Sequence, residues 1–232
     1  MATFETAGST HVGMVRSNNE DSYLICRKGV TLAAVADGIG GHANGEVASD
    51  MCCKLLEKKF MNSNIDDSWA SEDAARQFYN WIEEVNKEIY ARNLSEKNPD
   101  PMGTTLCGAM FFSDFVIIAN VGDSRFYALN KKKLVKLTTD HTVYHNGLPY
   151  LARAMGVSQK ARPAVSILRD NDTAKFIIMS DGIYNSMKEK KIAELLVKAE
   201  TAEAAAENMI DKANEDGGVD NLTAVVVFRK EK

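Results

Sequence analysis

The chain has 232 residues, of which 45% are hydrophobic and 26% are charged. A chain of this size can bury the core of one globular domain without cross-links, so we expect a single domain over residues 1–232. The formal net charge is −4, and lysine and arginine form no basic stripe that would bind nucleic acid. The sequence shows no signal-peptide pattern and no apolar run of the roughly 20 residues that cross a bilayer. We therefore expect a cytoplasmic protein without nucleic-acid or membrane partners, and take a monomer as the default.

Four cysteines occur in the chain, at Cys26, Cys52, Cys53 and Cys107. They form no CxxC pair and show no spacing typical of a disulfide framework or a zinc site. We expect them to be reduced thiols in the core.

The first part of the chain predicts strands followed by helices. Runs rich in β-branched, aromatic and small apolar residues predict strands at Tyr23–Cys26 and Leu32–Ala36. After Asn44-Gly45, apolar residues recur at helical spacing, which predicts two successive helices with one apolar stripe each. The stripes consist of Val47, Met51 and Leu55, and of Phe78, Trp81, Ile82, Val85 and Ile89.

Strand patterns then return in five runs, which predict an antiparallel meander. These runs are Thr104–Phe112, Phe115–Val121, Phe126–Leu129, Leu134–Leu137 and Phe176–Met179. Two further amphipathic helices are predicted, the first with Ile192, Leu195 and Leu196, the second with Ala202, Ala205, Ala206, Met209 and Ile210. A last strand is predicted at Leu222–Phe228.

The grouping of these elements indicates the fold class. Continuous apolar strands such as Phe115–Ala119 are typical of strands buried on both faces. Helices that come in pairs, and do not alternate with strands, argue against a parallel sheet. We therefore expect an α+β fold, a four-layer α-β-β-α sandwich of two antiparallel sheets flanked by helix pairs.

Four aspartates, Asp37, Asp123, Asp181 and Asp220, lie in turns at the ends of predicted strands. One such aspartate beside a glycine is typical of an ordinary turn, but four of them concentrate carboxylates. Hard cations such as Mg²⁺ and Mn²⁺ prefer carboxylate, carbonyl and water oxygens. The pattern therefore predicts a metal site at the strand ends.

Six short motifs in series resemble the type 2C metal-dependent protein serine/threonine phosphatases. They are GMVRSNNED (residues 13–21), ADGIGGH (36–42), GTT (103–105), GDSR (122–125), SDG (180–182) and DNLT (220–223). They occur in the order of that family, and the match spans residues 13–228. The histidine after the two glycines of the second motif is similar to the bacterial branch, whose members commonly oppose serine/threonine kinases.

The resemblance implies two divalent cations, Mn²⁺ or Mg²⁺. Asp37 would bridge the two cations, and the Gly38 carbonyl would bind one of them. Asp181 and Asp220 would complete the coordination of the other. Two such ions can hold a shared hydroxide in line with phosphorus, so that phosphoserine and phosphothreonine on proteins are hydrolysed without a covalent phosphoenzyme.

The resemblance also assigns an outer layer and a weaker site. Glu20 and Asp21 stand where the family orders metal-bound waters. Asp123, together with Asp181, matches the position that helps to bind a third, weaker cation in bacterial members.

Two more residues are implied in catalysis. The family places an arginine at Arg16 to bind the substrate phosphate, which its fork of donors can grip bidentately. His42 resembles the general acid that protonates the departing alkoxide. His141 and His145 are spaced as in zinc proteases, but Thr142 stands where that motif needs glutamate, so we interpret both as ordinary loop or helix residues.

The sequence offers three alternatives. GIGGHA at residues 38–43 fits the dinucleotide fingerprint, but a second helix follows the first, and Asp37 would lie beside the pyrophosphate. An inactive scaffold relative would be expected to have lost metal aspartates, and none is missing. A phosphatase dedicated to one regulatory phosphoprotein, in stress or sporulation control, stays open beside one that reverses a kinase on several substrates.

The sequence departs from the family between His141 and Arg153, which are separated by only eleven residues. Most bacterial members have a longer helical flap beside the active site in this interval. We therefore expect an abbreviated flap around residues 140–156, and an open site that discriminates weakly among short phosphopeptides.

Overall fold

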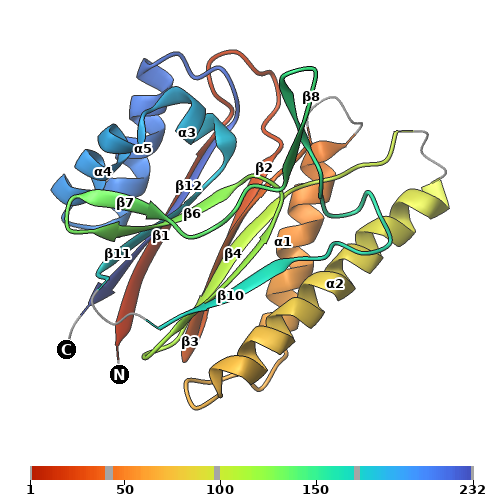
Figure 1. The fold of residues 1–232 in the computed structure, drawn as a ribbon, viewed down its shortest axis with the longest axis horizontal. Helices are drawn as coiled ribbons and strands as arrows, with labels where there is room; N and C mark the ends of the chain where they lie inside the picture. Colours follow the sequence, from red (N-terminus) through yellow and green to blue (C-terminus); the bar gives the residue numbers. More distant parts are fainter. Residues whose placement is uncertain (1, 40–43, 97–99, 170–172, 231–232) are drawn as a thin grey trace.

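The structure is a computed structural model that describes residues 2–39, 44–96, 100–169 and 173–230. Within these ranges, two five-stranded antiparallel sheets pack face to face, with helices on both outer sides (Figure 1). This arrangement confirms the predicted α+β sandwich.

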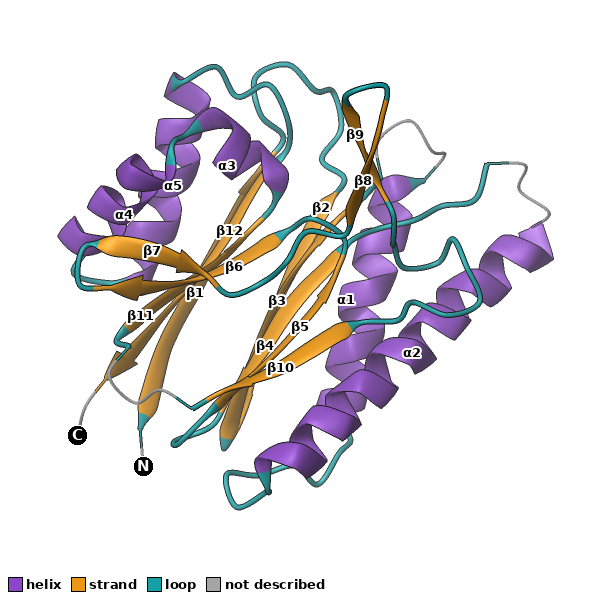
Figure 2. Ribbon diagram, viewed as in Figure 1, coloured by secondary structure: helices purple, strands orange, loops and turns teal. Residues whose placement is uncertain are grey.

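One sheet has the strand order β10-β5-β4-β3-β2 and is covered by two long helices (Figure 2). Its strands are β2 (Asp21–Lys28), β3 (Val30–Asp37), β4 (Leu106–Phe111), β5 (Val116–Val121) and β10 (Ala164–Leu168). The helices are α1 (Gly45–Met61) and α2 (Ser71–Glu96). The predicted stripe of α2 is buried, but in α1 the residues one position further along, Ala48, Cys52 and Leu56, are buried, and Val47, Met51 and Leu55 are only partly buried at the edge of that face.

The other sheet has the order β1-β12-β11-β6-β7, and its outer side carries three helices among the described residues. Its strands are β1 (Thr3–His11), β6 (Arg125–Asn130), β7 (Lys133–Lys136), β11 (Lys175–Met179) and β12 (Leu222–Lys230). The helices are the short α3 (Asp181–Ser186), then α4 (Glu189–Lys198) and α5 (Ala202–Glu215). None of the helices in the described part of the chain is long and apolar enough to cross a membrane.

The core has three layers, one between each sheet and its helices and one between the sheets. In β5, Ile117 packs on the helix side, while Val116 and Ile118 face the other sheet. This alternation explains why the strands are apolar at consecutive positions. Phe111 lies at the centre of the middle layer, with ring centroids 5.4 Å from Phe176 and 6.1 Å from Phe126. The four cysteines are buried and free, as expected.

The predicted meander is wrong, because the chain changes sheets between β5 and β6. The hairpins β4–β5 and β6–β7 are paired as expected, but they belong to different sheets. The crossing turn contains Gly122 at φ 108°, where a Cβ would come within 2.7 Å of the Thr105 side chain. Glycine is therefore required there, and the next residue, Asp123, is placed between the sheets rather than in a hairpin tip.

Several elements were not predicted, namely β1, β8 (Thr142–His145), β9 (Leu148–Leu151), β10 and α3. Strands β8 and β9 pair as a separate two-stranded hairpin in the interval of the expected flap. His145 therefore lies in a strand, which corrects its interpretation as a loop or helix residue, whereas His141 lies in the loop before β8.

A buried asparagine on α2 ties this helix to the loops beside the third motif. Asn93 Nδ2 donates to the carbonyls of Met102 (2.8 Å) and Gly156 (2.9 Å), and its Oδ1 accepts from Met102 N (3.0 Å). Thr104, two residues after Met102, bridges to both Gly38 and Met155. Asn93 thus holds the backbone that lies against the Asp37 turn.

Replacing Asn93 by alanine should lower the free energy of unfolding by about 3 kcal/mol, because buried backbone groups lose their partners. Urea denaturation monitored by circular dichroism measures this change. Leu94→Ala is the control, since Leu94 is 62% exposed and its truncation should cost less than about 0.5 kcal/mol. Equal stability of the two variants would show that these hydrogen bonds do not hold the loops.

Candidate metal centre

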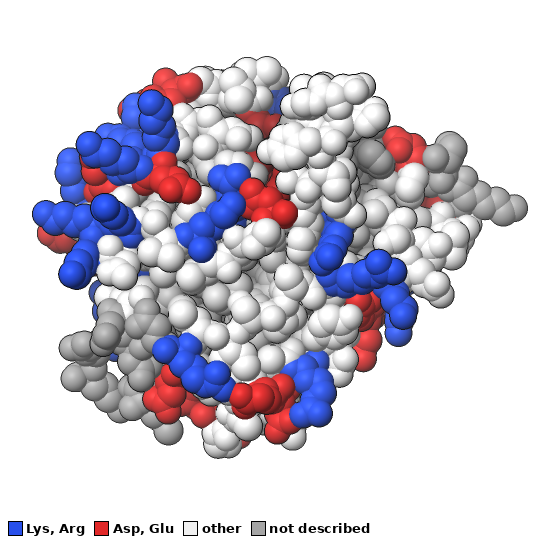
Figure 3. All heavy atoms as spheres, viewed as in Figure 1, with Lys and Arg blue, Asp and Glu red and all other residues white. Residues whose placement is uncertain are grey.

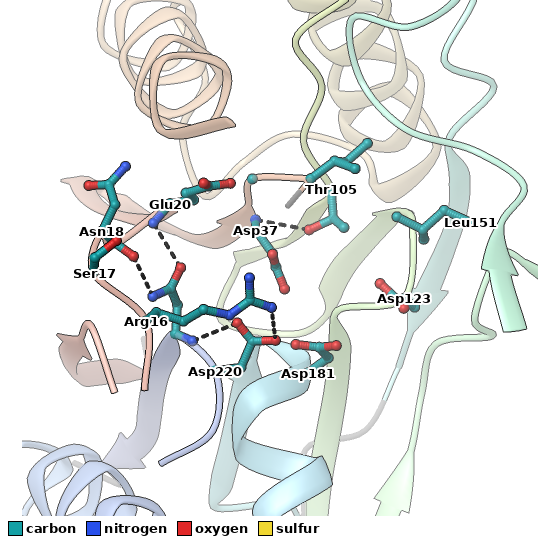
Figure 4. Close-up of a pocket in the computed structure, with 13 residues that line it drawn as sticks. Arg16, Ser17, Asn18, Glu20, Asp37, Thr105, Asp123, Leu151, Asp181 and Asp220 are labelled. Carbon is teal, nitrogen blue, oxygen red and sulfur yellow. Dashed lines mark hydrogen bonds and ion pairs between the residues drawn. The ribbon is translucent and has the colours of Figure 1, made fainter. Parts of the chain in front are cut away.

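A polar pocket of about 290 Å³ lies where strand ends of the two sheets meet (Figure 4). The carboxylates that line it come from Asp37 at the end of β3, Asp181 after β11 and Asp220 before β12. Asp123 joins them from the turn by which the chain crosses between the sheets. The structure thus brings together the four aspartates that the sequence singled out. The described residues that line it are Arg16, Ser17, Asn18, Glu20, Asp37, Gly38, Ile39, Thr105, Asp123, Leu151, Asp181, Asp220 and Asn221.

The backbone of Asp37 is held by the third motif. The Asp37 carbonyl accepts hydrogen bonds from Thr105 N (2.8 Å) and Thr104 Oγ1 (2.9 Å), and Asp37 N donates to Thr105 Oγ1 (3.0 Å). On the other side, Gly38 N donates to the Glu20 carbonyl at 3.1 Å. The turn is therefore fixed on both sides, and the Asp37 side chain points into the pocket (Figure 4).

Asn221 joins the loop at residues 12–20 to the last strand. Its Nδ2 donates to the carbonyls of Val12 (2.9 Å) and Asn18 (2.8 Å), and its Oδ1 accepts from Glu20 N (2.9 Å). A Cβ on Gly182 would lie 2.0 Å from the Asn221 carbonyl, so the Asp181-Gly182 turn packs directly against this clamp. A role for Asn221 was not predicted from the sequence, although its place in the DNLT motif was a signal.

Arg16 lies at the mouth of the pocket, and its Nη2 donates to Asp220 Oδ2 at 2.9 Å. The Arg16 side chain is 48% exposed, so the ion pair contributes little to stability. Only part of the guanidinium fork is used by Asp220, and the remaining donors are available to an anion.

The two acidic residues of the first motif occupy different positions. Glu20 lines the pocket, and its Oε2 is buried without a hydrogen-bond partner among the described residues. Asp21 is buried outside the lining, directly opposite Asp37 in the β2–β3 register. The hydroxyl of Ser180 donates to Asp21 Oδ2 at 2.7 Å and accepts from Thr223 N at 3.1 Å, which links the two sheets.

Burial and mutual repulsion raise the pKa values of these carboxyls. The pKa of Asp37 lies well above its usual range, first because of burial and then because Asp21, Asp181 and Asp123 surround it. Burial, together with Asp123, raises the pKa of Asp181 to about 7. Burial likewise raises the pKa of Asp21 to about 6 and that of Asp123 above its usual value. Bringing these carboxylates together therefore disfavours their charged forms, which a bound cation would favour.

The donors fit a hard cation. Among the described residues, no three side chains of His, Cys, Asp or Glu form a group that could hold a metal ion as they stand. The pocket nevertheless collects the carboxylates of Asp37, Asp123, Asp181, Asp220 and Glu20, and among the described residues its lining contains no histidine or cysteine. Such an all-oxygen set is typical of Mg²⁺ and Mn²⁺ sites, so small rotations of the aspartates toward a cation are the expected response to binding.

A network behind Asp123 was not predicted from the sequence. Tyr184 OH donates to the Asp123 carbonyl at 3.0 Å, and the Arg125 guanidinium stacks 3.6 Å from the centre of the Tyr184 ring. Arg125 is held in turn by Asp140, with Nη2 to Oδ2 at 2.8 Å. The position of Asp123 therefore depends on packing between β6 and α3.

His42, the predicted general acid, lies outside the described residues. The other three histidines do not line the described pocket. His141 accepts a hydrogen bond from Gly122 N at 3.2 Å, and burial lowers its pKa, so it serves as a structural anchor.

The carboxylate cluster should make the metal-free protein less stable as the pH rises. Because the pKa values of Asp37 and Asp181 are raised, the folded protein retains protons that the unfolded chain releases above about pH 4. The free energy of unfolding in a chelating buffer should fall between about pH 5 and about pH 8. Asp37→Asn should flatten this fall and stabilise the protein at about pH 8 by on the order of 1 kcal/mol or more.

Urea titrations at several pH values measure this effect, with Asp50→Asn as the matched control. Asp50 is exposed on α1, where it pairs with Lys54, so its substitution should leave the slope unchanged. If Asp37→Asn shows the wild-type slope, the carboxylates do not repel one another in the folded protein.

Comparison with known proteins identifies the family. Residues 8–224 match the sequence profile described as protein phosphatase 2C. The chain is 34% identical to the serine/threonine phosphatase stp of Listeria monocytogenes, over 95% of this chain and 94% of that protein. It is 30% identical to the serine/threonine protein phosphatase PstP of Mycobacterium tuberculosis, over 92% of this chain and 43% of that protein.

The structure agrees with these sequence matches. The crystal structure of the serine/threonine phosphatase Stp1 from Staphylococcus aureus superimposes with a TM-score of 0.91 at 28% identity, covering 99% of this chain and 96% of that chain. The resemblance inferred from the six motifs is confirmed, and the chain is a member of the protein phosphatase 2C family.

Proposed function

We propose that this protein hydrolyses phosphoserine and phosphothreonine on other proteins with the help of two divalent cations, Mn²⁺ or Mg²⁺. The observation that carries the proposal is the convergence of Asp37, Asp181, Asp220 and Asp123 on one pocket beside Arg16. Membership of the phosphatase family and the names of its relatives support the reaction and the substrate class.

The proposed cation ligands are Asp37, the Gly38 carbonyl, Asp181 and Asp220. Two bound cations would lower the pKa of a water between them and neutralise charge on the phosphoryl oxygens. Glu20, whose Oε2 has no other partner in the described structure, and Asp21 would orient the surrounding waters. Asp123, with Asp181, would hold a third and weaker cation.

Arg16 is the proposed phosphate-binding residue. Its guanidinium lies at the pocket mouth and uses only part of its fork on Asp220, which leaves donors for two oxygens of a phosphoryl group. The Asp220 contact aligns the guanidinium before the substrate arrives, so less conformational entropy is lost on binding.

His42 is the proposed general acid, on the strength of its place in the second motif. A serine or threonine alkoxide is strongly basic and needs a proton as it leaves. The described histidines do not line the pocket, and His141 already accepts a hydrogen bond from Gly122 N.

We propose that the physiological partners are a serine/threonine kinase and the proteins it phosphorylates. A phosphatase restricted to one regulatory phosphoprotein is the second candidate, because the interval before Arg153 is short and its Leu151 lines the pocket. An inactive scaffold is disfavoured, since all four aspartates are present and converge. The cytoplasmic location and the monomeric state stay predictions.

Activity on a phosphothreonine peptide should require added Mn²⁺ or Mg²⁺ and disappear after chelation. Asp181→Asn should lower kcat/KM by about 10²-fold or more at saturating metal, because one cation loses a charged ligand. Mn²⁺ should also raise the Tm of the wild type more than that of the variant. Asp211→Asn, on the exposed face of α5, is the control. Full activity after exhaustive chelation would rule out the two-cation proposal.

His42→Ala should slow hydrolysis of a phosphothreonine peptide by on the order of 10²-fold or more and slow p-nitrophenyl phosphate much less. Nitrophenolate leaves without a proton, so general acid catalysis matters only for the peptide. The ratio of the two losses is the measurement, and His145→Ala is the control because His145 is exposed in β8. Equal losses of rate on both substrates, with unchanged metal affinity, would show that His42 is not the general acid.

A further inference from the structure

The hairpin β8–β9, whose Leu151 lines the pocket, exposes large apolar side chains on both of its faces. The exposed fractions are 53% for Val143, 74% for Tyr144, 60% for Leu148 and 51% for Tyr150. The hairpin, residues 142–151, contains no Asp, Glu, Lys or Arg, although 26% of the chain is charged. Single exposed apolar residues are common on proteins, but an uncharged cluster of this kind is typical of an interaction surface.

The strand register assigns the hairpin residues to two faces. Thr142 lies opposite Leu151 and Tyr144 opposite Pro149, so Tyr144 and Leu151 share one face. Leu151 lines the pocket, which makes this the pocket face of the hairpin. Val143, His145, Leu148 and Tyr150 belong to the opposite face, and the His145 and Tyr150 rings contact each other there at 6.4 Å.

The base of the hairpin is anchored to the turn that carries Asp123. His141 N donates to the Gly122 carbonyl at 2.9 Å, and Gly122 N donates to His141 Nδ1 at 3.2 Å. Ala152 N, after β9, donates to the His141 carbonyl at 2.8 Å. The hairpin is therefore held in place relative to the aspartates, so a ligand that contacts both finds a preformed surface.

A second exposed apolar group lies beside Arg16 and Asp220. This rim patch consists of Met14, Val15 and Val219, which are 67%, 69% and 58% exposed. The loop with Met14 and Val15 is joined to the loop with Val219 by the hydrogen bond from Met14 N to the Gly218 carbonyl (2.7 Å) and by the Arg16–Asp220 ion pair. The rim patch is thus tied to the phosphate-binding arginine, as the hairpin is tied to Asp123.

The charges match this arrangement. Figure 3 shows a hollow at the upper edge of the molecule in which acidic atoms lie between two surfaces free of acidic and basic side chains. The pocket lining has Arg16 and Asp220 at one end and Asp123 and Leu151 at the other (Figure 4). A phosphoryl group bound there would have an apolar surface on each side.

We infer that the preferred substrates are phosphoprotein segments that carry apolar residues on both sides of the phosphorylated residue, one set on Tyr144 and the other on the rim patch. This inference rests on the proposed function. An extended chain advances roughly 3.3 Å per residue, so residues two to four positions away lie roughly 7–13 Å from the phosphorylated one. Such residues can leave the pocket and reach surfaces that adjoin its rim.

The contribution of these surfaces should appear in substrate binding and not in the chemical step. Neither Tyr144 nor the rim patch lines the pocket, so their contacts are equal in the ground state and the transition state. The preference should therefore lower KM and leave kcat nearly unchanged. Partial burial of one leucine side chain is sufficient for roughly a tenfold change in affinity.

The test compares short peptides with one central phosphothreonine and different flanks. One peptide carries leucine at several positions on both sides, two carry leucine on one side only, and a reference carries serine throughout. Glutamate and lysine flanks are included. We expect kcat/KM to be about tenfold higher for the two-sided leucine peptide than for the serine reference, with intermediate values for the one-sided peptides.

Variants assign the preference to the two surfaces. Tyr144→Ser should reduce the preference for leucine on one side of the phosphothreonine, and Val15→Ser should reduce it on the other side. Tyr150→Ser is the matched control, because Tyr150 is the same residue type on the opposite face of the same hairpin and should keep the full preference. The serine-flanked peptide is the reference for each variant, so a general loss of folded enzyme cancels in the ratio.

Several outcomes would overturn the inference. Equal kcat/KM for leucine and serine flanks, or a preference for charged flanks, would contradict it, and so would equal effects of Tyr144→Ser and Tyr150→Ser. A concentration-dependent dimer that Tyr144→Ser dissociates would assign the hairpin to a second copy of the chain instead. If no phosphopeptide is hydrolysed with Mn²⁺ present, the proposed function itself fails, which is distinct from hydrolysis without preference.

Discussion

The structure depends on holding several mutually repelling carboxylates at one point. Asp37, Asp181, Asp220 and Asp123 line one pocket, and Asp21 lies buried behind Asp37. Burial and repulsion raise the pKa values of Asp37 and Asp181, so that without a bound cation their charged forms oppose folding at neutral pH. The rest of the fold must offset this opposition, and cation binding would relieve it.

The apolar core between the two sheets offsets the unfavourable effect of the carboxylates. Phe111, Phe126 and Phe176 pack at the centre of the layer between the sheets, and the strands around them are buried on both faces. Polar links near the pocket then fix the position of one sheet relative to the other. Ser180 donates to Asp21 across the sheets, and Asn221 binds the loop that carries Arg16. Affinity for cations would therefore be coupled to the packing of the whole sandwich.

The surface around the pocket is organised by the same links. The hydrogen bonds between His141 and Gly122 hold the hairpin beside Asp123, and the Arg16–Asp220 ion pair joins the loops of the rim patch. Substrate selection and catalysis would thus share anchors, because the residues that position the carboxylates also position the apolar surfaces. An exchange of the hairpin sequence could alter selectivity while its base keeps the pocket intact.

The sequence alone determined the layers and the candidate ligands, since helical stripes, apolar strands and Asp-Gly turns are local patterns. It placed Asp37, Asp181 and Asp220 at strand ends, where the structure has them. Sheet membership was not determined, because a strand that is apolar on both faces carries no sign of its partner. The predicted meander was therefore wrong at the turn that contains Gly122, where the chain passes to the other sheet. The Asn221 clamp, the Arg125–Tyr184 network and the apolar faces beside the pocket arise from contacts between distant segments, so only the tertiary structure decided them.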